Sequence, residues 1–445
     1  MVAALWLVPG GDPGTKTLID AALLVGFAIG CWAFGWLAEP ATTLAFFLLV
    51  ILFHVAKPEV VFSGFASSAW WLVLGGSITA IAVQTTGLGG RLSGLLLRRA
   101  AGSYARAVSA VALAAVGLAF PMPATNGRIM LLMPIVLAFA ERLGLKPGRP
   151  GHTGLVLTVA AASYMVPTTI LPANVPNSIL LGAADSLYGV KLAYGPYLLL
   201  HFPILGALKT VALVWLVCRL FPEREGLRPA PAEDIGPISP EERRLCLLLI
   251  LSLLLFATDF VHGISPAWVS LGTGLLCFLP PLSLVTPADF SARINVPMLI
   301  YIAGILGLGA VVADSGLSAA VSTRLLTWAS LTPGHNLSNV AALSAIGAGL
   351  AALTTATGVP AVLTPLAQEF ANATGLPLIT VLMLQVVVFS TVFLPFESPP
   401  IMVALHLGGI GVRAATKLCL SLAAVTLLVL LPLDYLWWRL LGYLT

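Results

Sequence analysis

The sequence predicts an all-α polytopic membrane protein made of two inverted-topology repeats, each with a re-entrant hairpin and an interrupted helix. Three observations lead to this prediction. The chain has 445 residues, of which 59% are hydrophobic and only 9% charged, whereas a soluble domain carries about 25% charged residues. Apolar stretches close to the roughly 20 residues that cross a bilayer recur along the chain. The same order of elements then occurs twice, once on each side of a polar linker.

The polar linker divides the chain. Positions 222–244 are rich in arginine, which places this segment in the cytoplasm by the positive-inside rule. The first repeat is therefore expected at 1–221 and the second at 245–445. In the first repeat we expect scaffold helices at about 18–90, a hairpin at 106–142, a broken helix at 152–184 and a last helix at 196–221. The corresponding elements of the second repeat are expected at about 245–314, 338–372, 377–407 and 416–441.

The first hairpin is predicted from charge and helix breakers. Basic residues flank 106–142 on both sides, so both of its ends are expected in the cytoplasm. Its centre, 121–128, is polar and contains prolines, which break helices. The expected arms, 107–120 and 129–140, are too short to cross at a rise of about 1.5 Å per residue. We therefore expect a re-entrant hairpin with its tip near the midplane, with two short tilted helices as the alternative.

The second half has the same features in the opposite orientation. Its hairpin is centred on 354–360, and the flanks carry almost no basic residues. After each hairpin comes a helix interrupted in its middle, by 167–178 in the first half and by 394–400 in the second. Counting crossings onward from the cytoplasmic linker places the second hairpin on the outer side. Two oppositely oriented halves, each with an interrupted helix, are typical of secondary transporters.

Short motifs in these elements resemble the divalent anion:sodium symporter family. The segments at 36–43, 71–76, 132–135, 174–177, 363–366 and 398–401 are similar to its signatures. In this register the family's two Ser-Asn-Thr tips become Ala124-Thr125-Asn126 and Thr355-Ala356-Thr357. The resemblance implies an elevator-type, homodimeric carrier of dicarboxylates, tricarboxylates or sulfate in a bacterial inner membrane, with sodium at the hairpin tips.

The candidate site combines the two tips with the two breaks. Interrupted helices present N–H groups at one end, which suit a carboxylate or sulfate, and carbonyl oxygens at the other, which suit sodium. The expected substrate-binding residues are Ala124, Thr125, Asn126, Arg128, Asn174, Pro176, Asn177, Thr355, Ala356, Thr357, Ser398 and Pro399. The expected ligands of the coupling ion are Thr125, Asn126, Gly127, Thr355, Thr357 and Glu397.

Charged residues in these apolar elements leave alternatives open. Arg128 is expected to bind a substrate carboxylate, to replace a bound sodium ion, or to pair with Glu397 or local carbonyls. Glu397 is expected to be solvated, to pair with Arg128 or Lys209, or to couple transport to a proton. The sequence thus favours sodium-coupled transport of small divalent anions. Sodium-independent exchange and proton coupling are the alternatives within the class, and an anion channel is the alternative from another class.

Several other classes are disfavoured. A formal charge of +4 is too small to indicate a nucleic-acid partner. The five cysteines show no metal-ligand spacing, and no set of nucleophile, base and acid or phosphate-binding loop is present. We therefore expect no enzymatic activity, no organic cofactor and no transition metal. The expected partners are a small anionic metabolite, the lipid bilayer and a second copy of the chain.

Overall fold

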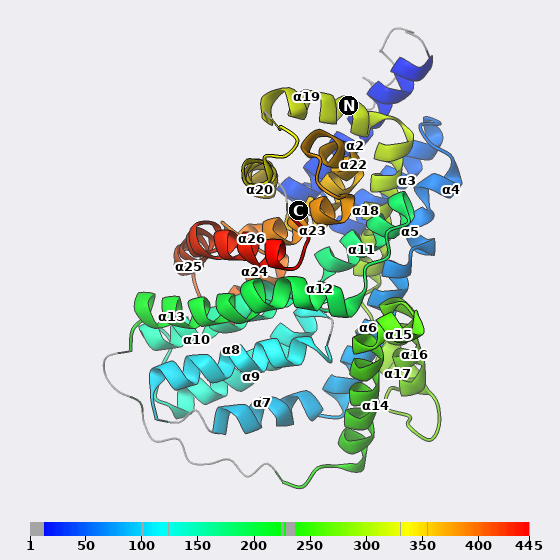
Figure 1. Ribbon diagram of the computed structural model, residues 1–445. Helices are drawn as coiled ribbons and strands as arrows, with labels where there is room; N and C mark the ends of the chain where they lie inside the picture. Colours follow the sequence, from blue (N-terminus) through cyan, green and yellow to red (C-terminus); the bar gives the residue numbers. More distant parts are fainter. Residues whose placement is uncertain are drawn as a thin grey trace.

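The computed structural model describes residues 13–98, 102–122, 124–223, 227, 236–329, 331–353 and 355–444. Every regular element in these ranges is a helix, as predicted (Figure 1). Among the described residues, four segments are long and apolar enough to cross a membrane, judged by length and composition: Thr15–Trp32, Tyr194–Leu220, Val296–Asp314 and Val412–Leu440. The other apolar helices are shorter, as expected for a fold with interrupted spans.

The segment that we expect to be the first repeat contains the following helices. Its scaffold consists of α2 (Pro13–Phe34), α3 (Glu39–Leu52), the short α4 (Pro58–Val61) and α5 (Ser63–Ala66), α6 (Ser68–Thr85) and α7 (Leu88–Arg98). The hairpin is α8 (Tyr104–Ala119) and α9 (Thr125–Arg142). The broken helix is α10 (Pro150–Tyr164), η1 (Pro167–Thr169), η2 (Leu171–Ala173) and α11 (Val175–Tyr188). The last span is α12 (Tyr194–His201), η3 (Phe202–Leu208) and α13 (Lys209–Leu220).

The segment that we expect to be the second repeat is described in the same way. Its scaffold is α14 (Pro240–Ala257), α15 (Asp259–His262), α16 (Pro266–Phe278), α17 (Pro287–Arg293), α18 (Val296–Asp314) and α19 (Leu317–Ala329). The hairpin is α20 (Asn336–Leu353), α21 (Gly358–Leu363), η4 (Thr364–Leu366) and α22 (Ala367–Thr374). The broken helix is α23 (Leu378–Phe389), η5 (Pro395–Glu397) and α24 (Pro399–Gly408). The last span is α25 (Val412–Val425), η6 (Thr426–Leu430) and α26 (Leu431–Leu440).

Helix boundaries differ from the expected ones at the tips and breaks. Proline and small polar residues are acceptable in the first turn of a helix, where N–H groups have no intrahelical partner. Consequently α9 starts at Thr125, α11 at Val175 and α24 at Pro399, all within segments expected to be loops. α9 has 18 residues, about 27 Å at 1.5 Å per residue, so this arm is longer than the expected 129–140 but still shorter than a hydrocarbon core of about 30 Å.

Helix α14 begins inside the segment that was expected to be the linker. α14 begins at Pro240 because Ser239 and Glu242 form a capping box, each side chain bonding the other's backbone N–H. Glu242 also pairs with Arg91 of α7, at 2.8 Å, and Arg91 donates to the carbonyls of Gly236 and Pro237. These contacts tie the start of the second repeat to the scaffold of the first. Residues 224–226 and 228–235 of the predicted linker, 222–244, lie outside the described residues.

The scaffolds of the two halves meet at a close helix crossing. α6 packs against α16 where Gly75 and Gly274 face each other. A Cβ atom at Gly75 would lie 2.5 Å from the backbone nitrogen of Leu271, so only glycine permits this approach. α14 packs against α16, and the hydroxyls of Ser252 and Thr273 lie 2.6 Å apart across that contact.

The first hairpin and the broken helices form a second group of packed helices. α10 contacts α8, α9 and α13 of its own half and α24 of the other half. Figure 1 shows α8, α9, α10 and α13 running side by side, with α6, α14 and α16 along the neighbouring edge. Within 151–164 of α10 only Thr153 is not buried. The interrupted helix is therefore held on nearly every side, which fixes the position of its broken end.

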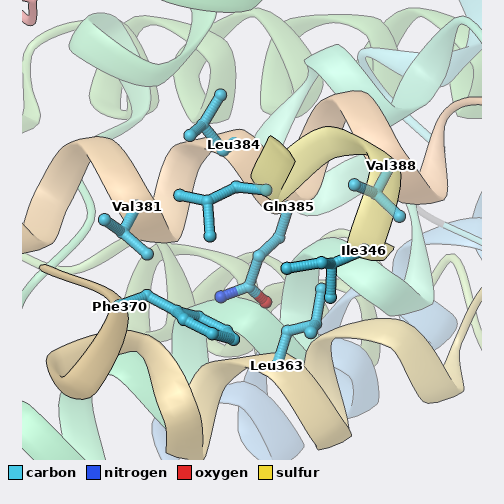
Figure 2. A pocket seen from close by; sticks show the side chains of 8 residues that line it. Ile346, Leu363, Phe370, Val381, Leu384, Gln385 and Val388 are labelled. Carbon is cyan, nitrogen blue, oxygen red and sulfur yellow. The ribbon is translucent and has the colours of Figure 1, made fainter. Parts of the chain in front are cut away.

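The second hairpin is less regular than the first. Pro134 stays within α9, whereas the matching Pro365 coincides with a 3₁₀ turn, η4. The Thr364 hydroxyl in this turn donates to Oε1 of Gln385, at 2.9 Å. Figure 2 shows the Gln385 side chain entering a small pocket near Leu363 and Phe370. Its volume of about 20 Å³ is room for a single water molecule, which would satisfy the unpaired Nε2 atom.

Candidate functional site

A cavity of about 450 Å³ lies between the scaffold and the two hairpin tips. On the scaffold side it is lined by α6, the end of α17 and the start of α18. On the other side it is lined by the first turns of α9, α11 and α24, and by Thr357 of the second tip. A cavity of this size suits a small organic or inorganic ligand. Elements from both halves of the chain therefore meet around one cavity.

Two helix N-termini contribute to the wall. Thr125, Asn126 and Gly127 form the first turn of α9 and line the cavity. Their N–H groups have no carbonyl to bond within the helix. Asn174 caps α11, and its Oδ1 accepts the Val175 N–H at 3.1 Å. Because a helix N-terminus carries partial positive charge, this wall favours an anion.

A hydrogen-bond network joins the first tip to the first break. The Thr125 hydroxyl donates to Oδ1 of Asn174, at 3.1 Å. Nδ2 of Asn174 donates to the Tyr164 carbonyl at the end of α10, at 3.0 Å. Asn177 donates to the Ile170 carbonyl, at 2.8 Å, inside the break. The network fixes Thr125 and Asn174 on the cavity wall and satisfies carbonyl groups that the interruption leaves free.

Two polar side-chain atoms of residues that line the cavity are buried and have no partner among the described residues. They are the Tyr164 hydroxyl and Oδ1 of Asn126. Buried polar groups are nearly always hydrogen-bonded, so an unpaired group beside a cavity indicates a ligand or ordered water. The Tyr164 hydroxyl can donate to an oxyanion, and so can the amide of Asn126.

The second tip is tied to the second break by its backbone. The Ala356 N–H donates to the Glu397 carbonyl, at 2.8 Å. The hydroxyls of Thr355 and Thr357 lie 2.9 Å apart, and Thr357 lies 2.8 Å from the hydroxyl of Tyr301 on α18. This cluster of hydroxyls offers oxygen ligands without a charged group of its own.

Arg128 lies in the first turn of α9 but is not among the residues that line the cavity. Its side chain is fully buried. Nη1 donates to the Met122 carbonyl, while Nη2 donates to the Thr125 hydroxyl, at 3.1 Å, and to the Ser163 carbonyl, at 2.8 Å. The expected alternative of an ion pair with Glu397 is therefore wrong, and the alternative of bonds to local carbonyls is confirmed.

Glu397 serves as a cap within its own break. Its two carboxylate oxygens accept the N–H groups of Phe393, at 3.0 Å, and Leu394, at 3.1 Å. The side chain is 1% exposed, so the expectation of a solvated carboxylate is wrong. The expected pairing with Arg128 or Lys209 does not occur either, because backbone groups occupy both oxygens.

Lys209 is buried at the other broken helix. Its Nζ donates to the Ser390 carbonyl, at 2.6 Å, and to the Ser390 hydroxyl, at 3.2 Å, just past the end of α23. Asp434 of α26 is also buried and interacts electrostatically with Lys209. Lys209 thus links the last spans of the two halves to the second break.

The family can be decided by comparison with known proteins. The family model described as "Sodium:sulfate symporter transmembrane region" matches residues 4–444. The chain belongs to the sodium:sulfate symporter family. It is 23% identical to the sodium-dependent dicarboxylate transporter SdcS of Staphylococcus saprophyticus, over 93% of this chain and 86% of that protein. A membrane protein of Cupriavidus necator is 24% identical over 86% of this chain and 76% of its own length.

A solved structure agrees with the fold. The YdaH transporter of Alcanivorax borkumensis aligns over 98% of this chain and 99% of its own, with a TM-score of 0.59 and 16% identity. Together these comparisons confirm the resemblance and an all-α integral membrane protein. Membership of a transporter family also confirms that this symporter-family chain is not an enzyme.

Some of the predicted site residues line the cavity, and others do not. The predicted residues that line it are Ala124, Thr125, Asn126, Gly127, Asn174, Thr357 and Pro399. The predicted residues that do not line it are Arg128, Pro176, Asn177, Thr355, Ala356, Glu397 and Ser398. Most of the second group lie directly behind the tips and breaks, where they position the wall.

The prolines reduce the number of donors that the breaks offer. Pro176 is the second residue of α11, and Pro399 and Pro400 are the first two of α24. Proline has no backbone N–H, so α24 presents its dipole without donors at these positions. The expectation that both broken helices supply N–H groups is therefore wrong for the first two residues of α24. The start of α9 is the better donor.

The scaffold side of the cavity was not predicted from the sequence. Ser77 and Gln84 of α6 and Tyr301 of α18 line it, as do Arg293 and Glu39, which are exposed at its rim. Polar residues within apolar spans commonly face cavities, so Ser77 and Gln84 could have been identified by that criterion. Tyr164 carries no such signal, because tyrosine is common in packed helices.

Proposed function

We propose that this protein is a secondary active carrier of small divalent anions: dicarboxylates such as succinate, tricarboxylates such as citrate, or sulfate. The observation that supports this most is that the first turns of α9 and α11 line one cavity together with Tyr164, whose buried hydroxyl has no partner among the described residues. Helix N-termini and neutral donors bind oxyanions without holding them as firmly as a cluster of arginines. A carrier needs this balance because its substrate must also leave.

The arrangement of the cavity also supports an alternating-access mechanism of the elevator type. One side of the cavity belongs to the scaffold and the other to the tips and broken helices. Movement of the second group against the first would carry a bound anion across the membrane. We propose inverted repeats with re-entrant hairpins, a homodimer held by the scaffold, and a bacterial inner membrane with 222–244 in the cytoplasm.

Sodium is the proposed coupling ion, and the second tip is its proposed place. The hydroxyls of Thr355, Thr357 and Tyr301 would supply neutral oxygen ligands there. Proton coupling through Glu397 is the alternative within the class. Substituting Glu397→Gln would then abolish the pH dependence of uptake, whereas a purely structural cap would lower thermal stability and leave the pH profile in place.

Uptake into proteoliposomes tests the proposal. Radiolabelled succinate, citrate and sulfate are offered with an inward sodium gradient or with choline at equal ionic strength. We expect saturable uptake of at least one anion, stimulated by sodium; uptake only into vesicles preloaded with anion would indicate exchange. Folded protein that moves none of the three, or that gives single-channel currents, contradicts a carrier of these anions.

A pair of asparagine variants connects uptake to the cavity. Asn126→Ala removes an amide from the wall and is expected to raise KM by about tenfold, the loss of one or two hydrogen bonds. Asn372→Ala is the matched control, because Asn372 is exposed and bonds only Gln368 among the described residues. Equal KM values for the two variants would place the substrate elsewhere.

A further inference from the structure

A positively charged side chain, that of Arg128, lies at the carbonyl end of α10, the first part of the first broken helix. Arg128 is 0% exposed, yet its guanidinium group bonds two backbone carbonyls and one hydroxyl. No carboxylate forms an ion pair with Arg128 in the part of the chain that the structure describes. A buried charge without a counter-ion costs several kcal/mol unless many dipoles compensate it. Something specific therefore retains an arginine at this position.

The partners of Arg128 indicate what it does. Ser163 is in the last turn of α10, whose carbonyl end carries partial negative charge. Met122 belongs to the turn of the first tip, and Thr125 begins α9. The two carbonyls and the hydroxyl around this guanidinium group are neutral oxygen ligands of the kind that suits a hard cation such as sodium. At this tip the guanidinium group already binds all three oxygens.

The second broken helix has a parallel arrangement. Lys209 is also 0% exposed, and its ammonium group binds the carbonyl and hydroxyl of Ser390 just past the end of α23. Each interrupted helix thus has a buried, protein-borne cation at its carbonyl end. The two cations differ in one respect. Lys209 has Asp434 nearby, whereas the partners of Arg128 among the described residues are all neutral.

We infer that Arg128 is a resident cation that takes the place of a coupling ion at the first hairpin tip, so that the described residues there do not fit sodium. This inference rests on the proposed function in treating the tip as part of a carrier. It has a mechanistic consequence. A fixed charge balances the anion beside Thr125 but cannot be released on the other side, so the first half contributes no transported sodium. Coupling to sodium is left to the second tip.

The test asks whether removing the guanidinium creates a cation site. Arg128→Ser and Arg128→Gln leave the oxygens of Met122, Thr125 and Ser163 without a cation. Each variant is produced and purified in sodium chloride and, separately, in choline chloride at equal ionic strength. We expect more of each neutral variant to be folded in sodium chloride than in choline chloride. Its melting temperature should also be higher in sodium, and this difference should exceed that of the wild type by at least about 2 °C. Arg128→Lys, which keeps a charge, is expected to show only the wild-type difference.

Protein recovery and melting temperature test the role of Arg128 without any transport measurement. A failure of this inference can therefore be told apart from a failure of the proposed function. If neither neutral variant is recovered better or melts higher in sodium than the wild type does, the inference is overturned, and this includes the case in which neither variant folds in either salt. A sodium response as large in Arg128→Lys as in Arg128→Ser also overturns it. Where the neutral variants transport, uptake should depend more steeply on sodium, with a Hill coefficient raised by up to one relative to the wild type.

Discussion

At the residue scale, Tyr164 separates binding from stability. Its hydroxyl is buried at the cavity without a partner among the described residues, so Tyr164→Phe removes a donor to the ligand and no internal bond. We expect KM for the transported anion to rise about fivefold, the value of one neutral hydrogen bond, with an unchanged melting temperature. Tyr197→Phe is the control, since the Tyr197 hydroxyl donates to the Thr168 carbonyl, at 2.7 Å, away from the cavity. The control should melt earlier with an unchanged KM; the reverse pattern would remove Tyr164 from the site.

Lys209 and Asp434 form a second residue-scale unit, with a structural role. Lys209→Met leaves the Ser390 carbonyl without its donor and the buried Asp434 without its positive neighbour, and an uncompensated buried group is destabilising. We expect a large drop in melting temperature. The double variant Lys209→Met/Asp434→Asn should recover part of that drop, because no uncompensated charge remains. Additive losses in the double variant would show that the two side chains do not interact.

At the element scale, the crossing of α6 and α16 depends on one glycine. A Cβ at Gly75 would lie 2.5 Å from backbone atoms of Ser270 and Leu271, which cannot move aside as a flexible side chain can. Gly75→Ala is expected to destabilise the protein by about 1–3 kcal/mol, the usual cost of overpacking. A Cβ added at Gly272 of α16 would have no atom within 4 Å, so Gly272→Ala should be neutral or stabilising through helix propensity. Thermal melting of the two variants compares them directly; similar values would contradict the tight crossing.

How far the sequence predicts these elements depends on the kind of signal. Apolar stretches located the spans, and Pro121, Pro172 and Pro395 located the tip and the breaks, because both signals act locally. The exact starts of α9 and α24 were missed, since proline and Asn126 are compatible with either a loop or a first helical turn. The partners of Arg128 were beyond prediction. Its contact with Ser163 depends on how α9 packs against α10, which is why the sequence leaves three alternatives for this residue open.

At the scale of the whole molecule, the two halves share an order of elements but not their electrostatics. The first tip contains a buried guanidinium, whereas the second tip offers the hydroxyls of Thr355 and Thr357. The second arm is also interrupted at Pro365, where the first arm continues through Pro134. A carrier built in this way would use one half to hold a permanent charge and the other to exchange a mobile one.

The proposed elevator movement can be tested on the whole molecule. Gln84 of α6 and Ala124 at the start of α9 both line the cavity, one from the scaffold and one from the first tip. In a background without native cysteines, Gln84→Cys/Ala124→Cys can be joined by a short, reducible bifunctional thiosulfonate. If the hairpin must slide past α6, the cross-link should prevent this movement, and uptake should fall in proportion to the fraction of protein that is cross-linked. Uptake should return when the cross-link is reduced, so the same variant serves as its own control.

A cross-link inside the scaffold supplies the control for that experiment. The hydroxyls of Ser252 and Thr273 lie 2.6 Å apart between α14 and α16, so Ser252→Cys/Thr273→Cys can be joined without bridging the cavity. Two helices that move as one body are not restrained by a bond between them, and uptake should survive this cross-link. Full uptake with Gln84 and Ala124 tethered would rule out movement of the tip against α6. Loss of uptake in both variants would instead indicate that the scaffold itself must deform during transport.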